Sequence, residues 1–200
     1  MLAKKLALVL MLLFTQQSFA AGPTDILDKA AAKFRAAGNV KIGFQVSADG
    51  GSTTGYIDLA GSKFHCDMAG IRVWFNGTDL WHYVKANDEV NITSPSPAEA
   101  AKFNPYSFIS QYKKQYTCKM GKSTAAYHEV ILTGKKGSTY KSVVVRLDKT
   151  SYQPVYIKTA TAKHSTEFTV NSYLTNQNFP ASTFTFNKKD YPNVEVVDLR

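Results

Sequence analysis

The side chains that could do catalytic chemistry do not form a recognisable arrangement in this sequence. It has no G-x-S-x-G turn, no H-E-x-x-H helix and no phosphate-binding glycine loop. Ser110 with Lys113 and Ser138 with Lys141 match S-x-x-K, but the S-D-N and K-T-G elements that accompany a catalytic serine of this kind are missing. The histidines stand singly in or beside predicted strands, where a histidine is far more often structural than a ligand. They are His65, His82, His128 and His164. We therefore predict that the chain is not an enzyme and holds no metal or cofactor.

The two cysteines, Cys66 and Cys118, are candidates for a structural bond. Neither lies in a C-x-x-C redox motif, and an oxidising compartment would allow them to pair. A disulfide between them would close a loop of about fifty residues and add about 3 to 4 kcal/mol of stability on the chain-entropy model. The alternative is two unpaired buried thiols.

The first twenty residues predict where the protein works. Lys4 and Lys5 precede an apolar stretch from Leu6 to Phe14, and Ser18-Phe19-Ala20 is a small-x-small cleavage site. Nine apolar residues are too few to cross a hydrocarbon core, which needs about twenty. No cysteine follows the cleavage site, so lipid attachment at the new N-terminus is not expected. Residues 1–20 are thus predicted to be a cleaved signal peptide that exports a soluble protein.

The mature part, residues 21–200, has the length of one domain with a real core. The formal charge of +9 falls to +7 without Lys4 and Lys5, so the chain stays basic. Its lysines are scattered or paired instead of gathered with aromatic residues on one face, which disfavours a nucleic-acid-binding protein. The charge suits a solvated surface that approaches anionic lipid or acidic partners.

The hydrophobic pattern predicts a mainly β protein with a few helices. Thr24 and Gly38 bracket an amphipathic helix, after which apolar residues recur at every second position. Ser96-Pro97-Ala98-Glu99 and Asn104-Pro105 predict two short helices in the middle of the chain. The first strand is expected at 40–46, and the second follows a turn and ends near residue 59. The other strands are expected at 63–68, 71–75, 79–85, 90–92, 125–133, 139–148, 155–162, 166–174, 183–187 and 194–197. About ten or eleven strands favour a strongly curved antiparallel sheet forming an incomplete β-barrel, with the N-terminal helix and the mid-chain helices against its concave side.

Large aromatic residues are concentrated in the first two thirds of the chain. They are Phe64, Trp74, Trp81, Tyr83, Phe103, Tyr106, Phe108, Tyr112 and Tyr116. Such residues either fill the core of a sheet of this size or line an apolar cavity whose wall is the sheet and whose lid is the helices.

The segment Phe75–Tyr83, FNGTDLWHY, resembles the [DN]G-x-x-LW-x-Y hairpin of the periplasmic outer-membrane lipoprotein carrier proteins, the LolA-like family. Three further features agree in order: an amphipathic helix before the first strand, Asn104–Ile109 in the mid-chain helical insert, and an ending of Ser182–Phe186 followed by Val194–Asp198. The resemblance covers nearly the whole mature chain.

This resemblance implies an unclosed β-barrel covered by helices, with an apolar cavity that receives the acyl chains of a lipoprotein. Such a carrier collects its cargo at the inner membrane and delivers it across the periplasm to the outer membrane. The implied partners are acylated lipoproteins, an ATP-driven inner-membrane complex that releases them, and an outer-membrane lipoprotein acceptor. A monomer that touches membranes only transiently is expected.

Strand parity and the resemblance together give a set of residues for the acyl-chain cavity and its lid. They are Phe44, Phe64, Met68, Trp81, Tyr83, Phe108, Ile109 and Tyr112. Which face of each strand points inward stays open between two options. In the resembling family an arginine shortly before the position of Phe64 helps to hold the lid closed, but the stretch Leu59–Lys63 has none. An ammonium group does not reproduce a guanidinium fork, so Lys63 is not an equivalent.

Two other classes of protein remain possible at this stage. A lipid- or lipopeptide-binding sensor of the same fold would bind without transporting. A hydrolase of cell-envelope material would need polar groups that converge in the cavity.

We expect the substitution Phe108→Glu to abolish the release of lipoproteins from spheroplasts while leaving the fold intact, because a carboxylate in the cavity would disfavour an acyl chain. A release assay, with circular dichroism as the check on folding, measures this. Unchanged release would show that Phe108 is not part of the acyl-chain site.

Overall fold

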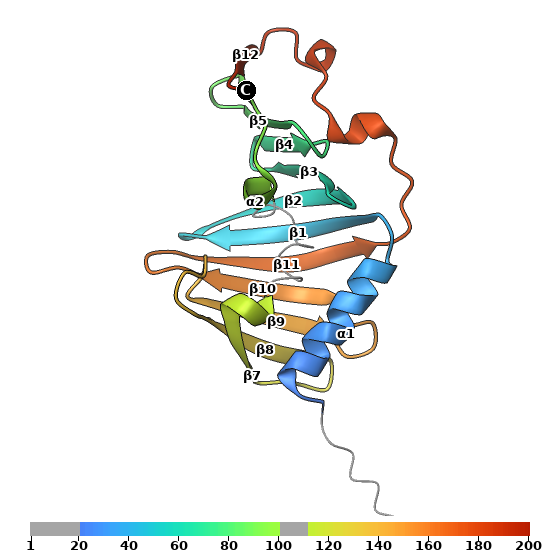
Figure 1. The fold of residues 1–200 in the computed structure, drawn as a ribbon, viewed down its shortest axis with the longest axis vertical. Helices are drawn as coiled ribbons and strands as arrows, with labels where there is room; N and C mark the ends of the chain where they lie inside the picture. Colours follow the sequence, from blue (N-terminus) through green and yellow to red (C-terminus); the bar gives the residue numbers. More distant parts are fainter. Residues whose placement is uncertain (1–20, 101–111) are drawn as a thin grey trace, which may run out of the picture.

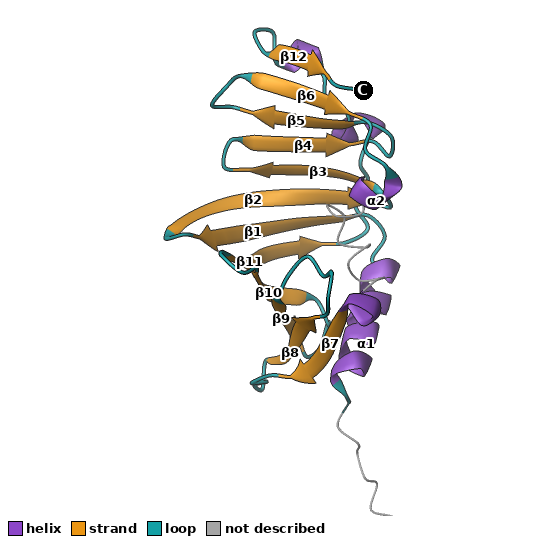
Figure 2. Ribbon diagram, turned by 60° about the vertical axis from the view of Figure 1, so that its left-hand side comes forward, coloured by secondary structure: helices purple, strands orange, loops and turns teal. Residues whose placement is uncertain are grey.

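The computed structural model describes residues 21–100 and 112–200, and its main element is one long curved sheet of twelve strands (Figures 1 and 2). The strands are β1 (Val40–Ala48), β2 (Gly51–Ala60), β3 (Lys63–Met68), β4 (Ile71–Phe75), β5 (Leu80–Val84), β6 (Glu89–Thr93), β7 (Tyr116–Met120), β8 (Tyr127–Gly134), β9 (Ser142–Asp148), β10 (Pro154–Ala160), β11 (Ser165–Leu174) and β12 (Glu195–Asp198). Their order is β12-β6-β5-β4-β3-β2-β1-β11-β10-β9-β8-β7. Within the described residues the sheet is not closed by hydrogen bonds, which confirms the predicted incomplete barrel.

All neighbouring strands are antiparallel except β12, which pairs in parallel with β6. Gly43 pairs with Ser172 and Phe44 with Val170, so Asn171 is the extra residue of a bulge in β11 where it pairs with β1. Bulges bend a strand and increase its twist. This one lies at the middle of the sheet, where the two halves of the strand order meet, and therefore contributes to the curvature seen in Figure 2.

The first helix, α1 (Pro23–Ala36), agrees with the predicted helix, although its N-cap is Gly22 and not Thr24. Pro23 stands at the first helical position, where its missing N–H is not needed. The Asp25 side chain accepts a hydrogen bond from the backbone N–H of Gly22 at 3.0 Å. The helix ends before Gly38, whose φ of 66° is readily adopted by glycine.

The mid-chain helix α2 (Pro97–Ala100) also follows its prediction. The Glu99 side chain accepts hydrogen bonds from the Ser96 backbone N–H at 2.9 Å and the Ser96 hydroxyl at 2.7 Å. The second predicted mid-chain helix lies outside the described residues. None of the helices in the described ranges is long and apolar enough to cross a membrane.

The prediction of a strand at 183–187 is wrong. Residues Ala181–Phe184 form a 3-10 helix, η1, and Lys188–Asp190 form a second, η2. The alternation of Phe184 and Phe186 suggested a strand, but these side chains instead anchor the segment to the sheet. Phe184 is 3% exposed, and the Phe186 ring packs on Trp74 at a centroid distance of 5.6 Å.

The strand register sorts the side chains onto two faces, because residues directly opposite each other in paired strands point to the same side. We call the face that packs on α1 the apolar face. It carries Val40, Ile42, Phe44, Val46, Ile57, Leu59, Phe64, Cys66, Met68, Val73, Phe75, Leu80, Cys118, Val130, Leu132, Val143, Val145, Ile157, Phe168, Val170 and Tyr173. The other side, the opposite face, is mostly polar.

The core has two clusters on the apolar face, and α1 contributes to both. Ile26 packs with Val130 and Leu132 of β8 in one cluster. Phe34 packs with Val40 and Leu59 in the other. One helix therefore ties together the two halves of the sheet.

The predicted disulfide is wrong, since both cysteines are free. Cys66 lies on β3 and Cys118 on β7, and six strands (β2, β1, β11, β10, β9 and β8) stand between β3 and β7 in the sheet. Both side chains are half-buried on the apolar face. Burial raises the pKa of Cys66 to about 11 and also raises that of Cys118.

The protein denatured without reductant should therefore react with two equivalents of a thiol reagent, one for each free cysteine. Adding reductant should leave the melting temperature unchanged. In the folded protein, Cys66 should react slowly at neutral pH because its raised pKa leaves little thiolate. Finding no titratable thiol, together with a lower melting temperature in reductant, would contradict this arrangement.

Candidate functional site

The structure separates the residues proposed for the acyl-chain cavity. Phe44, Phe64 and Met68 lie on the apolar face. Tyr112 is buried in the core cluster formed with Ile26 and β8. Phe108 and Ile109 lie outside the described residues.

Trp81 and Tyr83 lie on the opposite face. Trp81 is paired with Trp74 and Tyr83 with Val90, and all four belong to a third buried cluster. Side chains of the C-terminal segment cover this cluster, with the Tyr191 ring 5.0 Å from that of Tyr83. We therefore leave Trp81 and Tyr83 out of the candidate site.

The apolar face is not equally covered along its strands. On β1, Val40 is fully buried and Phe44 is only half-buried, while Val46, nearest the β1–β2 hairpin, is buried again. Neighbouring strands show the same change: Phe64 on β3 is buried and Met68 is half-buried. The surface formed by the incompletely covered residues is called the open apolar patch. It consists of Phe44, Ile57, Cys66, Met68, Val73, Ile157, Phe168 and Val170.

The sequence pattern did not identify six of these residues as cavity residues: Ile57, Val73, Ile157, Phe168, Val170 and Cys66, which was considered only as a disulfide partner. The sequence showed the alternation of these residues within their own strands. It did not show which residues of other strands lie beside them. Phe168 meets Phe44 only because β11 pairs with β1, and their rings lie edge to face at a centroid distance of 6.0 Å.

A glycine shapes the centre of the open apolar patch. Gly55 on β2 stands between Phe44 and Met68 in the register. A Cβ atom at this position would lie 2.6 Å from the backbone oxygen of Asp67, 2.9 Å from Met68 Cβ and 3.0 Å from Phe44 Cε2. The missing side chain thus lets the phenylalanine ring lie close to the sheet.

Tyr112 and Lys113 attach the chain to α1 where it re-enters the described region. The Tyr112 hydroxyl donates to Asp28 Oδ1 at 2.8 Å, and Lys113 Nζ lies 2.6 Å from Asp28 Oδ2. The hydrogen bond from Lys113 lowers the pKa of Asp28, and burial raises the pKa of Tyr112. The arrangement fixes Tyr112 and Lys113 relative to the helix.

The open apolar patch offers contact with hydrocarbon and no group for bond chemistry. Its one titratable type is the cysteine thiol, and Cys66 stays protonated near neutral pH because burial raises its pKa. No cluster of three or more metal-ligating side chains occurs in the described residues. The patch is thus suited to binding.

The family model of the outer membrane lipoprotein carrier protein LolA matches residues 13–163 of this sequence. The chain belongs to this family. No protein with a curated function matches it.

A solved structure has a similar fold. A crystal structure of an uncharacterized conserved protein from Thermus thermophilus aligns with a TM-score of 0.60 at 10% identity, covering 88% of this chain and 98% of that one. A LolA superfamily protein from Nitrosomonas europaea aligns with a TM-score of 0.42 at 12% identity, covering 84% of this chain and 99% of that one. At 10% identity the likeness to the Thermus thermophilus protein concerns the fold alone.

We expect Gly55→Ala to lower the free energy of unfolding by about 1 to 3 kcal/mol, because the added methyl group overlaps Met68 and the backbone of Asp67. Gly51→Ala on the same strand is the matched control, since its Cβ meets nothing nearer than the Ala48 backbone oxygen at 3.6 Å. Urea unfolding of the two variants measures the difference. Equal stabilities would show that the patch is not packed around Gly55.

Proposed function

We propose that this protein is a periplasmic carrier that shelters the acyl chains of lipoproteins on its apolar face and moves them from the inner to the outer membrane. The open apolar patch is the observation that carries the proposal. Its apolar side chains come from strands of both halves of the sheet, and they lie on the same face as the two core clusters. Membership of the LolA family supports the same interpretation.

The physical need for a carrier follows from the energetics of lipid transfer. Burying each methylene group is worth about 0.8 kcal/mol, so a triacylated protein almost never leaves a bilayer unaided. A carrier must cover these chains and still release them. Half-buried side chains such as Phe44 and Met68 suit this task because they keep apolar contact area available for a ligand.

Energy for loading would enter at an ATP-driven inner-membrane partner, because this sequence has no nucleotide-binding loop of its own. Delivery would then run downhill to an outer-membrane acceptor with higher affinity for the chains. Residues 1–20 would act as the cleaved signal that brings the chain to the periplasm.

One observation favours a second candidate function. Lys63 is exposed near the β2–β3 turn, and the stretch Leu59–Lys63 just before Phe64 has no arginine that could hold a lid closed. A lipid- or lipopeptide-binding module of the same fold would not need such gating, because it signals by binding and transports nothing.

The test compares Phe44→Glu with Gln45→Glu. The two residues are neighbours on β1, but Phe44 points to the apolar face and Gln45 to the exposed opposite face. We expect Phe44→Glu to lose binding of a fluorescent fatty acid and to lose lipoprotein release from spheroplasts, because a carboxylate is poorly tolerated among apolar side chains. Gln45→Glu should keep both activities, and melting curves of both variants control for folding.

The outcomes separate the two candidate functions. Fatty-acid binding that depends on Phe44, with lipoprotein release that does not require this protein, would favour the sensor. Unchanged fatty-acid binding by folded Phe44→Glu would contradict both, because the open apolar patch would then not be the acyl site.

A further inference from the structure

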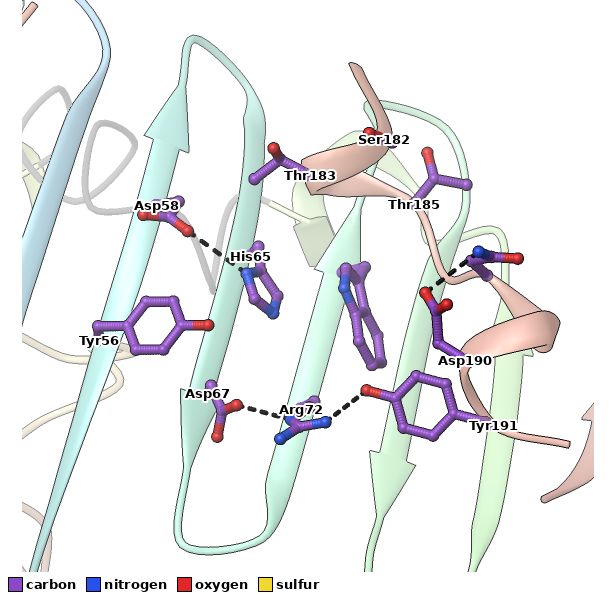
Figure 3. Close-up of a pocket in the computed structure, with 12 residues that line it drawn as sticks. Tyr56, Asp58, His65, Asp67, Arg72, Ser182, Thr183, Thr185, Asp190 and Tyr191 are labelled. Carbon is purple, nitrogen blue, oxygen red and sulfur yellow. Dashed lines mark hydrogen bonds and ion pairs between the residues drawn. The ribbon is translucent and has the colours of Figure 1, made fainter. Parts of the chain in front are cut away.

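A polar pocket of about 610 Å³ lies on the opposite face, away from the open apolar patch (Figure 3). One wall is formed by β2, β3 and β4, and the other by the C-terminal segment 182–191. This second wall lies beyond residue 163, where the match to the family model ends.

An Asp–His pair at the sheet side of the pocket leaves hydrogen-bonding capacity unused. Asp58 Oδ2 lies 3.4 Å from His65 Nδ1, and the two side chains are only 5% and 12% exposed. A carboxylate at this place favours the tautomer with the proton on Nδ1, so Nε2 becomes an acceptor. Nε2 has no hydrogen-bond partner in the described part of the chain. Asp58 Oδ1 has an ion-pair contact with Lys41 Nζ at 3.3 Å but no hydrogen bond to a described residue.

A second buried carboxylate on the same face shows how such a group is normally satisfied. Glu129 Oε2 accepts from Arg146 Nε at 2.7 Å, and its Oε1 accepts from the Lys122 backbone N–H at 2.9 Å. Buried polar atoms are rarely left without a partner, and each exception calls for an explanation. A ligand that donates hydrogen bonds to Asp58 and His65 would explain these two unpartnered atoms.

The same pocket also presents donors. Arg72 Nε donates to Asp67 Oδ2 at 2.6 Å, and Arg72 Nη1 donates to the Tyr191 hydroxyl at 2.5 Å, which leaves the hydrogen of that hydroxyl free for another partner. The Tyr56 hydroxyl makes no hydrogen bond to a described residue and points toward the space between His65 and Asp67 (Figure 3). Burial raises the pKa of Tyr56, so it stays a donor at neutral pH.

This mixture of groups disfavours two ligand classes. An anion would meet the carboxylates of Asp58, Asp67 and Asp190. An amine would meet the Arg72 guanidinium, and it could not accept hydrogen bonds from the Tyr56 and Tyr191 hydroxyls. A neutral ligand with several hydroxyl groups both donates and accepts, and it matches the alternation of acceptors and donors around the pocket.

We infer that this pocket binds a saccharide, either as a free monosaccharide or as one unit of a glycan chain. The buried acceptors at Asp58 and His65 would take its hydroxyl hydrogens, and the donors at Tyr56, Arg72 and Tyr191 would meet its oxygens. The pocket volume lies within the range of small-molecule sites. The pocket is separate from the open apolar patch. A result that disproves saccharide binding would therefore leave the proposed carrier function unaffected.

The test is a titration of the ¹⁵N-labelled protein with N-acetylglucosamine and with its linear trimer, followed by NMR. We expect shifts at the Trp74 indole N–H and at the backbone amides of β3, β4 and 182–191, with affinity in the millimolar range. Tyr56→Phe and His65→Phe should each weaken binding about fivefold, the worth of one net hydrogen bond. Tyr127→Phe is the matched control, because Tyr127 lies on the same face at β8, away from the pocket, and should change nothing.

Comparing the monosaccharide with the trimer distinguishes a site for a free sugar from a site for one unit of a glycan chain. Tighter binding of the trimer would identify a unit within a glycan chain, and equal affinity would identify a single sugar. Three results would overturn the inference: no shift at the pocket with either saccharide, shifts produced by ethanolamine or inorganic phosphate in place of the saccharides, or saccharide affinity unchanged in Tyr56→Phe. Tyr56→Phe removes one hydroxyl only, so it keeps the test valid should His65→Phe fail to fold.

Discussion

A twelve-stranded sheet with one apolar face needs far more cover than α1, the one long helix among the described residues, provides. Helix α1 has fourteen residues and is therefore about 21 Å long. Twelve strands at about 4.8 Å spacing extend about 53 Å across the sheet. The helix solves part of the problem by lying against both halves, with Ile26 in one core cluster and Phe34 in the other. Apolar area near the hairpin ends of β1 to β4 stays partly exposed, and this surface is the basis of the proposed acyl-chain site.

The opposite face is used differently. Its apolar part is small, at β4 to β6, and the C-terminal segment covers it with Phe186, Tyr191 and Val194. The contact between Arg72 and the Tyr191 hydroxyl helps to fix that segment and at the same time forms the floor of the polar pocket. One face of the sheet is thus suited to hydrocarbon and the other to a polar ligand, because neighbouring side chains in a strand point to opposite sides.

Local structure was predictable from local signals. The helix predicted between Thr24 and Gly38 is α1, which begins one residue earlier, at Pro23. The Asn76-Gly77 pair marks the β4–β5 hairpin, with Gly77 at a φ of 103°. Relations between distant strands were not predictable in this way. Parity within one strand does not say which residue of another strand shares its face, since a shift of one residue in register reverses the answer. Trp81 and Tyr83 were grouped with Phe64 for this reason, whereas the register pairs Phe64 with Phe75. The same limit explains why the disulfide prediction was wrong, because only the strand order shows that six strands separate β3 from β7.

The presence of acyl chains on the apolar face is the central claim, and native mass spectrometry tests it most directly. The protein would be isolated from the periplasm of the cells that make it, without detergent, and its intact mass measured under non-denaturing conditions. The account predicts a fraction of molecules carrying an additional mass that dissociates as an acylated protein, peptide or lipid. A protein that is always recovered at its bare mass, even after incubation with acylated lipoprotein, would contradict it.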